Sequence, residues 1–203
     1  FKMGKLTVEK CEIDGVLVIT PEVRVDERGY FMETYQQKDF EAAGVNVTFV
    51  QDNQSASKKG VIRGLHFQKE FPQDKLVRVL RGAVYDVCVD LREGSETFGK
   101  WKGVLLTEDN KKQFFIPKGF AHGFLVLTDV AEFCYKCDDD LNFNTCTEEE
   151  LQNYLINATF VVDGDVVTPT GDTTQKIAKR TGHQVQAGTW FELTSSQYIS
   201  DRT

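Results

Sequence analysis

The sequence predicts an all-β protein built as a sandwich or a barrel. From Leu6 to Leu127, short runs with β-type patterning follow one another and turn residues separate them. One short helix is expected in this part, at Gln37–Ala43, because Gly44 is a suitable residue to end it. The predicted strands are Val16–Ile19, Arg28–Thr34, Val45–Gln51, Val61–Gln68, Leu76–Leu80, Ala83–Leu91, Trp101–Thr107, Gln113–Ile116 and Phe124–Leu127.

The run from residue 84 to residue 91 alternates with period two. One face carries Tyr85, Val87, Val89 and Leu91, and the other carries Asp86, Cys88 and Asp90. This alternation is typical of an antiparallel strand with one face in the core, and the apolar face is the one expected to be buried.

Length and composition predict a single globular domain over residues 1–203. The chain is 40% hydrophobic and 27% charged, which is typical of globular proteins and excludes disordered or collagen-like classes. No run approaches about 18 consecutive apolar residues, and no secretory signal is recognised, so a cytoplasmic protein without a membrane partner is expected. The five cysteines are an odd number and favour reduced thiols over a disulfide framework.

The negative charge is concentrated in the last third of the chain. Residues 138–203 contain 11 acidic and 4 basic residues, a net charge of −7, which leaves residues 1–137 neutral. Nucleic acid is therefore not expected as a partner, because its binding needs a clustered basic surface. In this acidic segment the pattern predicts a helix after the capping box Thr147–Glu150, a hairpin at Phe160–Val167 and a strand within Gln184–Leu193.

Two of the three histidines lie in segments rich in polar and cationic residues. His66 lies in Arg63–Gln68, and His122 lies in Pro117–Phe124. On separate strands of a small barrel, two such histidines can converge on the interior, where a ligand binds at the mouth. The alternative is one histidine in the core and one in a turn.

A metal centre is not expected around His66. It needs three or four suitable ligands, and Phe67 and Gln68 occupy the positions where a second ligand would stand. We therefore expect no metal. His66 is then a neutral imidazole that can accept a proton near neutral pH.

Three cations are candidates for the surroundings of His66, although each alone is common as a surface charge. They are Arg63, Lys75 and Arg28. Nearby cations would keep the imidazole unprotonated and would stabilise an oxyanion or bind a diphosphate. Strict alternation places Arg63 and His66 on opposite faces, so both can point inward only if the strand bulges, and Gly64 is where a bulge would fit.

Tyr135 is a candidate acid. It lies on the same face of its predicted strand as Ala131 and Phe133, and a core aromatic is the alternative. A phenol across a pocket from His66 would allow one group to remove a proton and the other to deliver one, as inversion at a carbon centre requires.

Six motifs, in order over about residues 8–137, closely resemble the dTDP-4-dehydrorhamnose 3,5-epimerase family. They are Asp26–Glu33, Phe49–Asn53, Val61–Gln68, Lys75–Val77, Asp86–Arg92 and Pro117–Phe124. The resemblance implies a cupin-type double-stranded β-helix, that is, a jelly-roll barrel with few short helices. It also implies a homodimer, the absence of metal and cofactor, and the substrate dTDP-4-dehydro-6-deoxy-D-glucose on the route to dTDP-L-rhamnose.

The same resemblance implies roles for individual residues. His66 matches the base, Tyr135 matches the acid and Lys75 matches the group that stabilises the enolate oxygen. Arg63 and His122 match neighbours of the sugar and the oxyanion. Positions that hold the nucleotide diphosphate, partly across the dimer, are matched by Arg28, Phe31, Glu33, Gln51 and Asn53.

The resemblance ends after Cys137. The family's tyrosine pair, its tryptophan-containing stretch and its Leu-Ser-x-Lys-Asp motif have no recognisable counterpart in residues 138–203. The aspartate of that motif orients the catalytic histidine. Asp172 and Asp201 are the candidates nearest in position, and the carboxylate partner of His66 stays unassigned.

This departure leaves several functions open. Three alternatives are open for the acidic segment 138–203. It closes the same barrel in a divergent way, it narrows the reaction, or it disables catalysis. The leading prediction is epimerisation at C3 and C5, and the enzymatic alternatives are a mono-epimerase or a 3,4-ketoisomerase on a related dTDP-4-keto-sugar. The alternative from a different class is a noncatalytic nucleotide-sugar binding protein.

Overall fold

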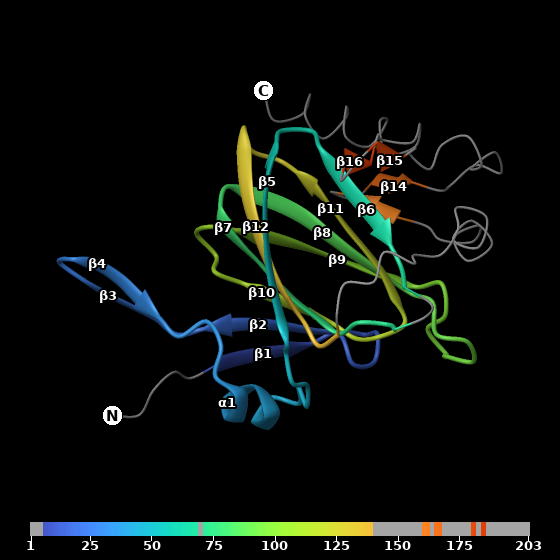
Figure 1. Cartoon of the computed structure of the whole chain (residues 1–203), viewed down its shortest axis with the longest axis horizontal. Helices are drawn as coiled ribbons and strands as arrows, with labels where there is room; N and C mark the ends of the chain where they lie inside the picture. Colours follow the sequence, from blue (N-terminus) through green and yellow to red (C-terminus); the bar gives the residue numbers. More distant parts are fainter. Residues whose placement is uncertain are drawn as a thin grey trace.

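Two antiparallel sheets form the body of the protein (Figure 1). The computed structural model describes residues 6–68 and 71–139, together with the short strand segments 160–162, 165–167, 180–181 and 184–185. The six-stranded sheet has the order β1 (Leu6–Lys10), β2 (Leu17–Pro21), β10 (Gln113–Ile116), β7 (Lys75–Arg81), β12 (Val130–Cys137), β5 (Gln51–Lys58). The four-stranded sheet has the order β6 (Ile62–His66), β11 (Phe120–Val126), β8 (Ala83–Asp90), β9 (Trp101–Thr107). The predicted all-β sandwich is confirmed.

The main core lies between the two sheets. Alternate residues of each strand point into this space, as the period-two geometry of strands requires. The six-stranded sheet contributes Val18, Val77, Val79, Phe114, Ile116, Ala131 and Phe133, and the four-stranded sheet contributes Val84, Cys88, Val104, Leu106, Phe120, Phe124 and Val126. The rings of Phe124 and Phe133 stack across the sandwich with centroids 4.1 Å apart, which joins the two sheets at the centre.

A second apolar cluster covers the outer face of the six-stranded sheet. Helix α1 (Gln37–Ala42) ends near the expected boundary and places Phe40 against Leu17, Ile19 and Phe115. The side-chain oxygen of Gln36 accepts a hydrogen bond from the backbone amide of Asp39 and so caps the first turn.

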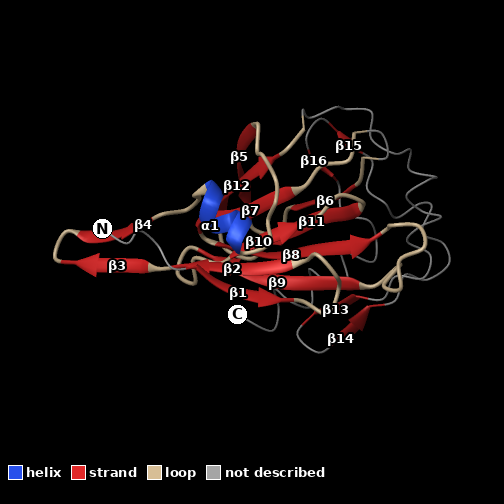
Figure 2. Ribbon diagram, turned by 90° about the horizontal axis from the view of Figure 1, so that it is seen from below, coloured by secondary structure: helices blue, strands red, loops and turns tan. Residues whose placement is uncertain are grey.

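The predicted strand Arg28–Thr34 corresponds to a strand over residues 29–32, which is one arm of a hairpin that projects away from the sandwich. Strands β3 (Val23–Asp26) and β4 (Gly29–Met32) pair with each other and form a separate two-stranded sheet. In Figures 1 and 2 the hairpin extends beyond the two main sheets. Its side chains include exposed apolar groups, because Val25, Tyr30 and Phe31 are 77%, 57% and 66% exposed.

The predicted strand Val45–Gln51 is wrong, because the observed strand begins at the residue where the predicted strand ends. Residues 45–50 are irregular, whereas β5 runs over Gln51–Lys58. The alternating apolar residues Val45, Val47 and Phe49 join the cluster around Phe40 instead of pairing as a strand. The true strand escaped detection because its inward face is polar.

The inward face of β8 is also not the one expected. Asp86, Cys88 and Asp90 on the inward face are fully buried. On the apolar face Val89 and Leu91 are buried as expected, but Tyr85 and Val87 are only partly buried. The inward face of β8 contains polar side chains that are partners of other interior groups. The alternation of polar and apolar residues therefore predicted the wrong inward face.

Part of the acidic segment can be compared with its predictions. The hairpin at 160–167 is confirmed, since β13 (Phe160–Val162) pairs with β14 (Asp165–Val167). A pair of two-residue strands follows, β15 (Arg180–Thr181) and β16 (Gln184–Val185), and β16 coincides with the start of the predicted strand at 184–193. The helix predicted after Thr147 lies outside the described residues. Within the described chain, the structure contains no helix with the length and apolar character of a membrane span.

Candidate active site

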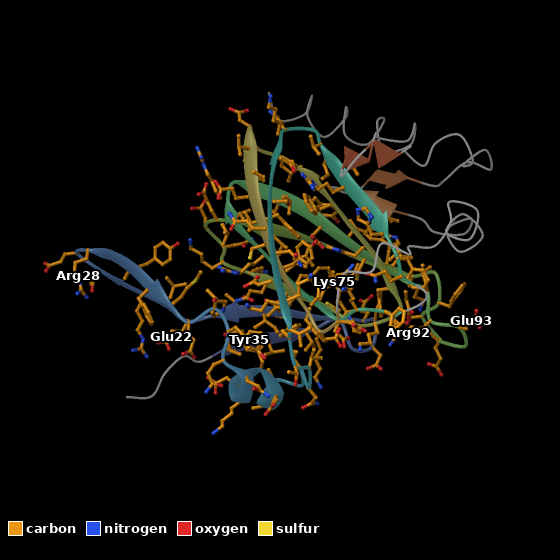
Figure 3. All side chains as sticks on the ribbon, in the orientation of Figure 1. Glu22, Arg28, Tyr35, Lys75, Arg92 and Glu93 are labelled. Atoms are coloured by element: carbon orange, nitrogen blue, oxygen red, sulfur yellow. The ribbon has the colours of Figure 1, made fainter. Side chains whose placement is uncertain are left out.

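The inward faces of β7, β12 and β5 become polar towards one end of the sandwich. Lys75 pairs with Cys137, which in turn pairs with Gln51. Two residues further along the same strands, Tyr135 pairs with Asn53. Residues opposite one another in a ladder share a face, and Tyr135 packs against the main core, so all five face the interior. In Figure 3, Lys75 accordingly lies within the body of the sandwich.

Strand β6 forms the facing wall and contains the predicted bulge. His66 pairs with His122, and Arg63 pairs with Phe124, so two residues of β6 lie opposite a single residue of β11. The irregularity falls at Gly64, whose φ of 138° suits glycine. As expected from the sequence, the bulge turns both Arg63 and His66 inward.

His122 is held by a buried carboxylate. Its Nε2 lies 2.9 and 3.0 Å from the two carboxylate oxygens of Asp86, and its ring stacks near Phe133 at a centroid distance of 6.2 Å. Asp86 is fully buried and His122 is 6% exposed. Burial raises the pKa of Asp86, and the charge and hydrogen bond of His122 oppose that rise.

Lys75 approaches the same carboxylate. Burial lowers the pKa of Lys75, and the negative charge of Asp86 partly offsets this effect. The interaction is mutual, because Lys75 in turn favours the ionised form of Asp86. Lys75, Asp86 and His122 therefore form one electrostatic group that spans both sheets.

Tyr135 lies on the wall opposite His66. Burial raises the pKa of its phenol, and the positive charge of Arg63 partly opposes that rise. The phenol therefore stays protonated at neutral pH and is able to donate a proton. Arg63 itself reaches across to the six-stranded sheet, where its Nε donates to Oγ of Ser57 at 2.9 Å.

Six of the nine other predicted site residues face the interior of the sandwich together with His66. They are Tyr135, Lys75, Arg63, His122, Gln51 and Asn53. Glu33 directly follows β4 of the hairpin. Arg28 and Phe31 lie on the projecting hairpin, where Arg28 pairs with Asp26. Figure 3 shows Arg28 at the tip of the hairpin, far from Lys75. One chain alone thus does not bring these two residues to the interior site.

Two polar residues of the site were not singled out from the sequence. Asp86 appeared only as part of a motif, and Ser57 lay in a segment that was not predicted as a strand. A carboxylate between apolar neighbours in a buried strand is a usable signal, because an ionisable group in such a place needs a partner. Asp172 and Asp201, the candidates for orienting His66, lie outside the described residues.

Potential metal ligands do not cluster in the described part of the chain. No group of three or more histidine, cysteine or acidic side chains there has an arrangement that would hold a metal ion.

Comparison with known proteins identifies the family. The model of the dTDP-4-dehydrorhamnose 3,5-epimerase family matches residues 10–159. The chain belongs to this family. It is 55% identical over 137 residues to the dTDP-4-dehydrorhamnose 3,5-epimerase of Methanothermobacter thermautotrophicus, covering 68% of this chain and 74% of that protein. It is 59% identical over 133 residues to the Escherichia coli enzyme of the same name, covering 64% and 72%.

Solved structures of the family extend the match in length. An epimerase from Legionella pneumophila in complex with dTDP-4-keto-L-rhamnose is 41% identical, with a TM-score of 0.72, and the match covers 93% of this chain and 91% of that one. The Mycobacterium tuberculosis epimerase is 31% identical, with a TM-score of 0.69, and covers 97% and 100%. The predicted cupin-type fold is confirmed by these relatives.

Proposed function

We propose that this protein epimerises C3 and C5 of dTDP-4-dehydro-6-deoxy-D-glucose to give dTDP-4-dehydro-L-rhamnose. The observation that carries the proposal, beside membership of the family, is the placement of an imidazole and a phenol on facing walls of one polar interior. Inversion at carbon needs a base on one face of the sugar and an acid on the other.

The chemistry follows from the C4 ketone of the substrate. The ketone acidifies the hydrogens on C3 and C5, so a base can remove either of them and leave an enolate. Return of a proton to the opposite face inverts the centre, and the overall reaction neither gains nor loses atoms. No redox step is involved.

Each interior residue has a role in this scheme. His66 removes the proton, and Tyr135, whose raised pKa keeps it protonated, returns one from the facing wall. Lys75 stabilises the enolate oxygen, and Asp86 helps to keep the buried ammonium charged. His122, fixed by Asp86, and Arg63 contact the sugar and its developing oxyanion.

We assign the nucleotide diphosphate to a second group of residues, partly contributed by another subunit. Gln51 and Asn53 line the interior, where the side-chain amide of Asn53 donates to Oε1 of Gln51 at 3.2 Å. Arg28, Phe31 and Glu33 belong to the hairpin and the residue that follows it. The hairpin projects from its own sandwich with exposed apolar side chains, which is a geometry suited to insertion against a second copy in a homodimer.

A cytoplasmic location is part of the proposal. Among the described residues, Cys11, Cys88, Cys134 and Cys137 are all free thiols, which suits a reducing compartment.

Two variants test the division of labour between base and acid. His66→Asn is expected to lower turnover by about 10² to 10⁴-fold while dTDP binding by calorimetry is retained. Tyr135→Phe is expected to slow product formation more than wash-out of substrate protons into deuterated water, because abstraction precedes reprotonation. Equal loss of exchange and product in Tyr135→Phe, with exchange intact in His66→Asn, would reverse the assignment.

A further inference from the structure

Strand β5 places a serine hydroxyl beside the bulge of β6. Ser57 pairs with Ala131 in the ladder and therefore shares the inward face with Asn53. It is 9% exposed. Strand β5 is at the edge of the six-stranded sheet and β6 is at the edge of the four-stranded sheet, so this serine lies where the two edges meet.

The hydroxyl binds the guanidinium of Arg63. Arg63 Nε donates to Ser57 Oγ at 2.9 Å, and Nη2 lies 3.5 Å from the carbonyl oxygen of Ala56. These two nitrogens lie on one edge of the planar guanidinium, so contacts from neighbouring residues of β5 fix its plane and not only its position. A guanidinium on a long, flexible side chain would otherwise lose much more conformational freedom when it bound a ligand.

We propose that Ser57 is a positioning residue that holds Arg63 in the orientation in which it binds the sugar. The inference rests on the proposed function, because the role of Arg63 in binding the sugar is taken from it. Ser57 itself makes no contact with substrate and acts only through Arg63. The bulge at Gly64 brings Arg63 to the inward face, and Ser57 on the opposite sheet selects its orientation.

Replacement of the hydroxyl tests this role. Ser57→Ala removes the acceptor and leaves the strand backbone unchanged, whereas Ser57→Thr keeps an Oγ in the same place. Loss of one hydrogen bond to a charged group predicts a rise in KM of about tenfold for Ser57→Ala, with kcat changed less than about twofold. Ser57→Thr is expected to restore KM to within about threefold of wild type.

A matched control separates this effect from damage to the strand. Gln54→Ala removes a polar side chain from the outward face of β5, where Gln54 Nε2 donates to Glu132 at 3.3 Å. It is expected to leave kcat and KM unchanged. Thermal melting of every variant verifies that each one is folded.

A double-mutant cycle with Arg63→Lys shows whether Ser57 acts through Arg63. Lysine lacks the planar edge that Ser57 binds, so Ser57→Ala should raise KM in the wild-type background and have no further effect beside Arg63→Lys. Additive effects of the two substitutions, or a wild-type KM in Ser57→Ala, would overturn the inference. Absence of turnover by the wild-type protein would instead overturn the proposed function. Failure of the inference and failure of the proposed function are therefore distinguishable.

Discussion

At the scale of single residues, the buried carboxylate of Asp86 connects the two cationic or basic groups of the interior. It binds His122 at 2.9 Å and favours the charged form of Lys75 against the effect of burial. Asp86→Asn keeps the shape but removes the charge, so the pKa of Lys75 is expected to fall further. We predict that kcat/KM at pH 7 falls by on the order of tenfold and that the basic limb of its pH profile moves to lower pH.

Asp90→Asn is the control for this prediction. Asp90 is also fully buried on β8, but its carboxylate accepts hydrogen bonds from Arg92, Ser95 and Thr97. Its replacement is expected to lower the melting temperature and leave the pH profile of kcat/KM in place. A basic limb that is identical in Asp86→Asn and wild type would contradict the role given to Asp86.

At the scale of elements, the bulge of β6 determines which side chains reach the site. A Cβ at Gly64 would lie 2.5 Å from Cα of Gly123 on β11, and the φ of 138° is unfavourable for any other residue. Gly64→Ala is therefore expected to destabilise the fold by at least about 2 kcal/mol, which is about 4 to 8 °C in melting temperature for a chain of this size.

Gly94→Ala separates the steric clash from the backbone strain. Gly94 also has a positive φ, 79°, but an added Cβ would meet nothing within 4 Å. It should cost about 1 kcal/mol and leave turnover unchanged. Equal melting temperatures for the two variants would show that the close approach of β6 and β11 is unimportant.

A second element-scale feature is a clasp, here defined as Asp74, Lys118 and Asp138, that ties the starts of β7 and β11 to the end of β12. The backbone amide of Asp74 donates to Asp138 at 2.8 Å, the backbone amide of Lys118 donates to Asp74 at 2.9 Å, and Lys118 Nζ lies 2.6 Å from Asp138. Burial, together with the charge of Asp138, raises the pKa of Asp74 to about 6.

The raised pKa of Asp74 predicts that the clasp loses stability as the pH rises. The folded state holds the proton of Asp74 up to about pH 6, whereas the unfolded chain releases it near its ordinary value of 3.8. The stabilisation is therefore complete below pH 3.8 and lost as the pH passes 6. Asp74→Asn is neutral at every pH. The difference between its melting temperature and that of the wild type should therefore increase as the pH rises from about 4.5 to 8. This increase corresponds to roughly 1 to 2 kcal/mol in the free energy of unfolding.

Asp90→Asn provides the contrasting case for these melting curves. Hydrogen bonds, with that of the Arg92 side chain the largest, outweigh burial and lower the pKa of Asp90 to about 2. Its stabilisation is therefore complete above the unfolded value and constant between pH 5 and 8. A difference between Asp74→Asn and wild type that does not change with pH would refute the raised pKa.

The elements also show what sequence patterning can and cannot predict. Apolar strands and the bulge at Gly64 followed from periodicity and glycine placement. The polar strand β5 did not, because its inward residues, including Asn53 and Ser57, are polar and so lack apolar alternation. The same cause reversed the assignment of the buried face of β8, where Asp86 points inward. Patterning therefore fails where the interior is polar, which is where the site lies.

At the scale of the whole molecule, the site is proposed to be completed by a second copy. A mixed dimer of His66→Asn and Arg28→Ala tests this directly. If each hairpin serves the partner's interior, one of the two sites in each mixed dimer combines an intact His66 with an intact Arg28. Each variant alone is expected to have little activity. Mixing the two, after reversible dissociation, should then restore about a quarter of wild-type activity, given random pairing.

Failure of the mixture to regain activity, although mass measurement shows mixed dimers, would mean that each hairpin serves its own chain. A monomer by sedimentation at assay concentration would contradict the dimer itself.

The single-domain organisation over residues 1–203 and the role of the acidic segment 138–203 stay predictions, since family motifs identified the first two thirds of the chain and the acidic segment lacks them.

The central claim is that the two walls of one polar interior exchange protons at both carbons next to a ketone. Proton NMR of dTDP-4-dehydro-6-deoxy-D-glucose with the wild-type protein in deuterated water measures this directly, because signal loss at C3 and at C5 is followed separately. We predict loss at both positions. Loss at one alone would identify a mono-epimerase, and loss at neither with dTDP still bound would identify a nucleotide-sugar binding protein, so either result would contradict the account.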